Sequence, residues 1–247
     1  MSPALPARLL VVLPPEETAL ALLDTALAMA ERLERELVAL LVEDRRLLAS
    51  AALPFTRIVS RTSGGEREFD VAATERMIRV FAERARHHLA EVTRSRRVRW
   101  RIETSRGLET VSAGADDVVA LATPSGLWPE EPPARLPCPV LLMGRPGGPL
   151  VLVHRGGRAG LELAREVARR TELPLLVIAA DERGAAEARA VLGQEVRIET
   201  CPADEVGRLA ERLRALAPGL VLIDACEDRA AWRAAVEAVR PAAQPLL

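Results

Sequence analysis

Residues 8–44 read RLLVVLPPEETALALLDTALAMAERLERELVALLVED, and residues 149–181 read PLVLVHRGGRAGLELAREVARRTELPLLVIAAD. Each stretch is a short apolar run, a turn, an amphipathic helical pattern and a second apolar run that ends at an acidic residue. This order indicates a strand–helix–strand unit. Because the unit opens two successive segments of domain size, the sequence predicts two tandem α/β domains.

We place the first domain at residues 1–145, with an insertion at 45–69, and a shortened second domain at 149–247. Mostly apolar strands that alternate with helices predict a parallel sheet covered on both faces. Right-handed crossovers make each sheet doubly wound. We expect two separate sheets related by a pseudo-twofold axis, and a single continuous sheet would contradict this expectation.

The expected strands follow from short apolar runs. The segment 97–103, RVRWRIE, instead alternates between apolar and charged residues, which suits a strand at the edge of a sheet. The expected strands are 9–13, 37–42, 97–103, 118–122 and 139–143 in the first domain, and 150–153, 175–179, 196–198 and 220–223 in the second, where 245–247 is a candidate fifth strand.

The composition excludes several classes of chemistry and of binding partner. The 247 residues carry a net charge of −1 and contain no lysine, which excludes a P-loop lysine and a Schiff-base lysine. The 3 cysteines form no CxxC pair, so neither a disulfide framework nor a zinc site is predicted. No apolar run is long enough to span a membrane. We expect a cytoplasmic protein with no nucleic-acid or membrane partner.

The two opening stretches resemble a universal stress protein domain. The segments ADDVVAL, APGLVLIDA and CPVLLM also fit, so the resemblance covers nearly the whole chain as two copies. It implies a five-stranded parallel sheet of order 3-2-1-4-5 in each copy. Some members of that family bind ATP through an aspartate after the first strand and a glycine loop after the fourth, whereas others do not bind ATP.

This sequence departs from the ATP-binding pattern. The first strand ends in Leu13-Pro14-Pro15, without an aspartate. After the fourth strand, the first copy keeps only Gly126 of the glycine loop, and the second copy has no glycine there. The resemblance therefore implies a member that does not bind ATP, and we expect no cofactor.

The best candidate for an anion site is the turn His154-Arg155-Gly156-Gly157, which follows a strand and opens a helix. A plain glycine turn is the simpler alternative. Asp44, Asp181 and Asp224 end strands at the carboxyl edge, where they could bind a ligand or cap helices. No catalytic or metal-binding motif appears, so we do not expect an enzyme.

The insertion 45–69 is a candidate interaction segment. Its apolar part has too many apolar side chains to remain exposed to water. It therefore either packs on its own domain or binds a second copy of the chain or another protein. The residues concerned are Leu47, Leu48, Ala51, Leu53 and Phe55. The function predicted from the sequence is a non-enzymatic binding or signalling module in stress response. The alternative is a small-ligand or nucleotide-binding protein that uses the turn His154–Gly157.

Overall fold

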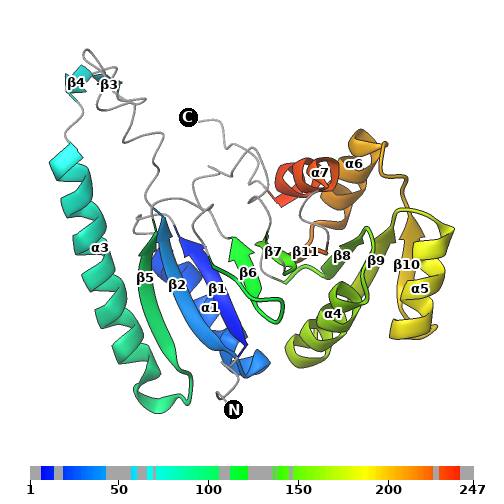
Figure 1. Cartoon of the computed structure of the whole chain (residues 1–247), viewed down its shortest axis with the longest axis horizontal. Coiled ribbons are helices and arrows are strands. Elements are labelled where there is room, and N and C mark those ends of the chain that lie inside the picture. The colour runs from blue at the N-terminus through cyan, green and yellow to red at the C-terminus, as the bar shows by residue number, and fades with distance from the viewer. Residues whose placement is uncertain are drawn as a thin grey trace.

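A computed structural model gives the structure of this chain. It describes residues 7–13, 19–42, 57–59, 66–68, 71–105, 112–121, 136, 138–144, 147–224 and 228–239. The possible strand at 245–247, Asp44, and the apolar residues Leu47, Leu48, Ala51, Leu53 and Phe55 lie outside these residues. The fold is α/β, with a nine-stranded, mostly parallel sheet of Rossmann-like type (Figure 1).

The first half of the chain supplies five strands of the large sheet, in the order β5-β2-β1-β6-β7. Numbered along the chain within this half, the order is 3-2-1-4-5, as predicted. These strands are β1 (Arg8–Leu13), β2 (Glu36–Val42), β5 (Trp100–Ser105), β6 (Val118–Leu121) and β7 (Val140–Met143). The helices are α1 (Ala19–Leu33) and α3 (Val71–Val92), which continues into the 3-10 turn η1 (Thr93–Ser95).

The second half supplies four described strands in the order β10-β9-β8-β11, which is 3-2-1-4 in chain order. These strands are β8 (Leu150–His154), β9 (Leu175–Ala179), β10 (Arg197–Thr200) and β11 (Leu220–Ile223). The helices are α4 (Arg158–Thr171), α5 (Glu182–Leu192), α6 (Val206–Leu216) and α7 (Arg229–Val239).

The expectation of two separate sheets is wrong. β7 pairs with β6 in parallel and with β11 antiparallel, in the register Leu220↔Met143 to Ile223↔Val140, so all nine strands form one sheet. β7 and β11 are buried along their whole length, as is β6. If the edges of β7 and β11 did not pair, their buried backbone N–H and C=O groups would lack partners. Pairing the two edges satisfies these groups.

Two glycines allow the chain to pass close to itself at this junction. A Cβ on Gly144 would lie 2.4 Å from the carbonyl oxygen of Pro218, and one on Gly148 would lie 2.3 Å from the carbonyl oxygen of Ala217. The backbone of Gly144 also donates a hydrogen bond of 2.8 Å to the carbonyl of Gly219. The linker that follows β7 is therefore held against the turn that precedes β11.

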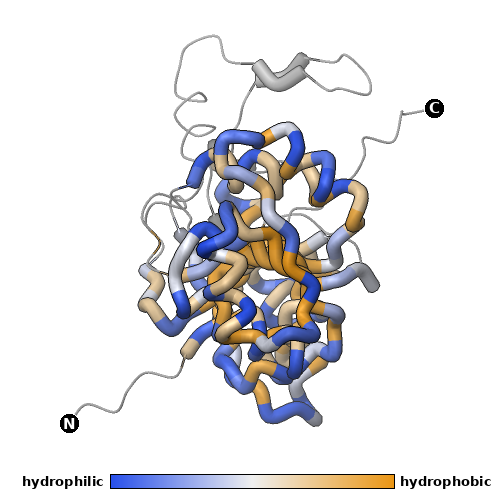
Figure 2. The backbone as a smooth tube through the Cα atoms, turned by 90° about the vertical axis from the view of Figure 1, so that its right-hand side faces the viewer, coloured by the Kyte–Doolittle hydropathy of each residue, from blue (hydrophilic) through white to orange (hydrophobic). Residues whose placement is uncertain are grey.

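Helices cover both faces of the sheet. On one face α3, α1, α4 and α5 stand side by side over an apolar core that runs through both halves (Figure 1). On the other face α6 and α7 pack over a second apolar core, and α7 contacts both β11 and β7. Figure 2 shows the hydrophobic strands in the interior and the more hydrophilic segments outside them.

The alternating segment lies at an edge of the sheet, as predicted. β5 pairs only with β2 among the described strands, in the register Leu37↔Trp100 to Val42↔Ser105. It begins at Trp100 rather than at Arg97, because the 3-10 turn at Thr93–Ser95 delays the entry into the sheet. The indole N–H of Trp100 donates a hydrogen bond of 3.0 Å to Oγ1 of Thr93, which fixes this corner.

The insertion 45–69 contains two short strands. Its described residues form β3 (Arg57–Val59) and β4 (Glu66–Glu68), which pair antiparallel as a small separate sheet. The contacts of the apolar residues 47–55 lie outside the described part of the chain, so their role as an interaction segment stays a prediction.

Candidate functional site

The candidate site lies where the strand order of the second half reverses. β8 and β11 are neighbours, and helices leave their carboxyl ends toward opposite faces of the sheet. In doubly wound sheets this switch point opens the crevice in which ligands bind. His154 ends β8 and Asp224 directly follows β11, so the fold brings two predicted candidates to the same place.

His154 and Asp224 form a buried pair. Nδ1 of the imidazole lies 2.5 Å from Oδ2 of Asp224, and each side chain is 1% exposed. The other carboxylate oxygen of Asp224 accepts a hydrogen bond of 2.8 Å from the backbone N–H of Arg155. A single carboxylate thus ties the end of β11 to the end of β8 through both of its oxygens.

The surroundings favour the protonated form of His154. Burial alone would lower the pKa of His154. The hydrogen bond and the charge of Asp224, together with the charge of Glu187, raise this pKa by more than burial lowers it. The pKa of the imidazole therefore lies above its ordinary value. Among the described residues Nε2 has no hydrogen-bond partner, and a carboxylate oxygen of Glu187, on α5, lies 3.9 Å away.

Arg155 points to the opposite face of the sheet from α4. Its Nε donates to Oδ2 of Asp228 at 3.0 Å, and its Nη1 donates to the carbonyl of Cys201 at 3.2 Å. Nη2 is buried and has no hydrogen-bond partner. Asp228 also caps α7 by accepting bonds from the N–H groups of Ala230 and Ala231. Arg155 therefore joins the ends of β8 and β10 to the start of α7.

The two glycines of the turn direct the chain from β8 into α4. Gly156 and Gly157 have φ values of 135° and 109°, in the region that favours glycine. No atom lies within 4 Å of a Cβ built on either residue. Gly157 is the N-cap of α4, and within the described part of the chain no side chain at this position accepts a capping hydrogen bond.

A carboxylate of the protein already lies beside the first turn of α4. A Cβ on Gly160 would lie 2.3 Å from Cβ and 3.1 Å from Oδ2 of Asp224. Only glycine therefore lets α4 approach Asp224 so closely. The side chain of Asp224 therefore occupies the space beside the first turn of α4.

Asp181 acts as a helix cap rather than as part of the pair. Its Oδ1 accepts a hydrogen bond of 2.7 Å from the N–H of Gly184, in the first turn of α5. A Cβ on Gly184 would lie 3.4 Å from Cδ2 of His154, so this turn packs on the imidazole. The alternative interpretation of Asp181, that it caps a helix, is confirmed. Within the described ranges, no group of three or more His, Cys, Asp or Glu side chains could hold a metal ion.

The pair has two of the three parts of a hydrolase triad, a histidine and a carboxylate that orients it. The third part would be a nucleophile within hydrogen-bond reach of Nε2. Nε2 instead faces Glu187 and is shielded from solvent. The pair therefore joins the ends of β8 and β11 and packs against the first turn of α5.

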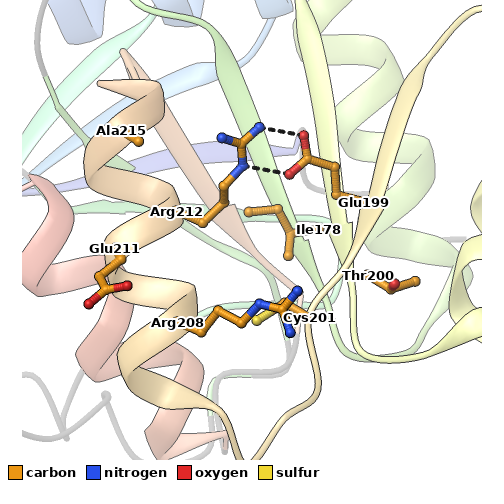
Figure 3. A pocket seen from close by; sticks show the side chains of 8 residues that line it. All are labelled: Ile178, Glu199, Thr200, Cys201, Arg208, Glu211, Arg212 and Ala215. Carbon is orange, nitrogen blue, oxygen red and sulfur yellow. Dashed lines mark hydrogen bonds and ion pairs between the residues drawn. The ribbon is translucent and has the colours of Figure 1, made fainter.

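The sequence did not indicate two further features. Arg8 and Asp117 form a partly buried ion pair at the amino ends of β1 and β6, with Nη2 2.5 Å from Oδ2. A cavity of about 360 Å³ lies between β9, β10 and α6, and Arg208, Arg212 and Cys201 are among its lining residues (Figure 3). Neither feature carries a local motif, because each depends on residues from separate elements.

Comparison with known proteins adds no family name. No model of a known protein family matches the chain. No curated protein matches it either. Among the described helices, none is long and apolar enough to cross a membrane.

Proposed function

We propose that this chain is a non-enzymatic binding or signalling module of the universal stress protein kind, which acts in stress response and does not depend on ATP. The strand order 3-2-1-4-5 in the first half supports the proposal, and the second half repeats the order as far as its described strands extend. The order of apolar runs and helical patterns in the sequence, which resembles this family, supports the same proposal.

The observation that carries the proposal is the position of Asp224. Its carboxylate lies beside the first turn of α4, bonded to His154 and to the N–H of Arg155. This is the place where a doubly wound sheet would hold the phosphates of a nucleotide. An internal carboxylate there supports a role that does not require nucleotide binding in the second half.

Equilibrium dialysis of the full chain against labelled ATP tests this proposal. We expect no retained nucleotide at micromolar concentrations. Saturable binding at one site per chain with micromolar affinity would overturn the ATP-independent part of the proposal. Release of ADP or phosphate in proportion to added protein would overturn the non-enzymatic part.

A second candidate function is the binding of a small anion or a nucleotide at the turn His154–Gly157. The N-terminus of α4 and the space around Gly156 and Gly157 favour it. A ligand that binds only the folded chain would raise its melting temperature by mass action. A melting screen with inorganic phosphate and nucleotides tests this, and Gly157→Asp should abolish any shift that arises at the turn.

We also propose that a second copy of the chain or another protein docks on the insertion 45–69. The apolar residues Leu47, Leu48, Leu53 and Phe55 support this proposal. Deletion of residues 47–60 and measurement of the mass in solution test it. If the shortened chain keeps its assembly state but loses thermal stability, the segment packs internally and the proposal fails.

A further inference from the structure

The cavity beside α6 lies on the opposite face of the sheet from the turn that opens α4. Ile178 of β9, Cys201 after β10 and Ala215 of α6 give it an apolar lining, and Arg208 and Arg212 of α6 reach across it (Figure 3). Its volume of about 360 Å³ falls within the range of small-molecule sites. It is an opening with a mixed apolar and charged wall at the carboxyl ends of two strands.

The two arginines differ in how firmly they are held. Arg212 donates two hydrogen bonds of 2.6 Å to the carboxylate of Glu199, which fixes both side chains. Arg208 pairs at 2.9 Å with Glu205, which lies three residues earlier on the same side of α6, and these side chains are 66% and 42% exposed. Exposed pairs of this kind contribute little. Arg208 can therefore exchange Glu205 for another anion at low cost.

The wall at Cys201 lies between two positive charges. Arg208 reaches toward Cys201 from the cavity (Figure 3). Arg155 approaches from the interior, with Nη1 on the carbonyl of Cys201 and a buried Nη2 that has no hydrogen-bond partner. Burial, and to a smaller extent the charges of Glu205 and Asp204, raise the pKa of the Cys201 thiol against the opposing effect of both arginines, so the thiol does not neutralise them at neutral pH.

The carboxylates of the cavity do not block this wall. Glu199 is engaged by Arg212, and the adjacent arginine holds the pKa of Glu199 below its ordinary value. The carboxylate of Glu211 points away from Cys201 (Figure 3). The region between Arg208 and Cys201 therefore favours a negative group next to an apolar surface.

We propose that this cavity binds a small organic anion, with a compact apolar body against Ile178, Cys201 and Ala215 and a single carboxylate or phosphate on Arg208. The site goes beyond the proposed function, because it uses neither the turn that opens α4 nor the insertion. Arg208 supplies the charge that selects the ligand. Ile178 and Cys201 are 0% and 3% exposed. Most of the contact area therefore comes from Ala215 and from the aliphatic stems of Arg208 and Arg212.

A series of one-ring probes separates charge from shape. Benzoate, phenyl phosphate, benzyl alcohol and benzamidine are titrated into the ¹⁵N-labelled full chain, and amide shifts are followed by NMR. We expect saturable shifts at the amides of Ile178, Cys201 and Ala215 with the two anions. Benzyl alcohol should bind about tenfold more weakly or worse, because it lacks a charge-assisted hydrogen bond. Comparison of benzoate with phenyl phosphate distinguishes a carboxylate ligand from a phosphate ligand.

Two arginine variants of the same helix provide the matched test. Arg208→Ala should weaken benzoate about tenfold and remove its advantage over benzyl alcohol. Arg214→Ala should leave binding unchanged, because Arg214 pairs with Glu237 and does not line the cavity. The proposal is overturned if benzoate gives no saturable shift at these amides up to about 20 mM, well above a millimolar Kd. It is also overturned if Arg208→Ala binds benzoate as the natural chain does, or if benzamidine binds as well as benzoate.

Discussion

The imidazole of His154 and the carboxylate of Asp224 meet at 2.5 Å, although 70 residues separate them in the chain. Both side chains are 1% exposed, so the pair has almost no access to water. The contact joins the carboxyl ends of the two strands between which a doubly wound sheet opens its crevice. Four expectations follow from this pair and from the packing around the shared sheet.

Asp224→Asn should lower the free energy of unfolding by about 1–3 kcal/mol, because it removes a charge-assisted hydrogen bond and His154 must lose its proton to remain buried. Chemical denaturation followed by circular dichroism measures the loss. Asp24→Asn is the matched control, since His88 and Asp24 form the same kind of pair at 2.7 Å with side chains 28% and 50% exposed. The control should lose less than about 1 kcal/mol. Equal losses in the two variants would contradict a special role for the buried pair.

Stability should fall as the pH rises above neutrality. The folded chain raises the pKa of His154 above the unfolded value of about 6.5, so the folded state holds the proton more tightly. The resulting stabilisation is complete below about pH 6.5 and is lost as the pH rises through the folded pKa. Urea midpoints between about pH 6 and 9 measure this slope. His154→Asn should flatten the slope, and an unchanged slope in that variant would count against His154 as its source.

Gly148→Ala should destabilise the chain by about 1–3 kcal/mol, the usual cost of overpacking. A Cβ there would lie 2.3 Å from the carbonyl oxygen of Ala217 and 2.4 Å from the backbone nitrogen of Gly219, and backbone atoms cannot turn aside. Gly207→Ala is the matched control, because no atom lies within 4 Å of its Cβ position in α6. The control should stabilise the chain by about 0.5–1 kcal/mol through helix propensity. Thermal melts of both variants decide, and a neutral Gly148→Ala would contradict close backbone packing at this junction.

Acid should weaken the chain through Asp117. Burial alone would raise the pKa of this carboxyl. The hydrogen bonds from Arg8 and from the N–H of Gly114 lower it by more than burial raises it, so the pKa lies below its ordinary value. This contribution is present above the unfolded pKa of about 3.9 and is lost as the pH falls through the folded pKa. Asp117→Asn should reduce stability at pH 7 and reduce its dependence on pH below about 4. Denaturation midpoints at pH 7, 4 and 3 test this, and parallel acid curves for the two chains would contradict it.

Much of the fold could be predicted from local patterns. Continuous apolar runs located the strands at 150–153 and 175–179, and the alternation of RVRWRIE predicted an edge strand. The joining of β7 to β11 could not be predicted in this way. Both strands are apolar on both faces, so no periodicity shows which edge of either strand meets a partner from the other half.

The sequence predicted the residues of the candidate site but not their arrangement. Glycines after a strand indicated the turn at His154–Gly157, and acidic residues at strand ends indicated Asp181 and Asp224. The pairing of His154 with Asp224 depends on β8 and β11 being neighbours, which the strand order implies but no local pattern states. The cavity at Arg208 depends on how α6 lies across β9 and β10, and that is decided by packing over the whole face.

The antiparallel pairing of β7 with β11 also has a mechanical meaning. The hydrogen-bond ladder between them crosses the boundary between the two halves, and α1 meets α4 across the same boundary, where the side chain of Arg170 donates to the carbonyl of Arg32. A hinge needs a few residues that can rotate freely, and a shared ladder does not offer them. The two halves are therefore built to resist rotation against each other as separate bodies, and we expect any change of shape to be a twist or shear of the shared sheet.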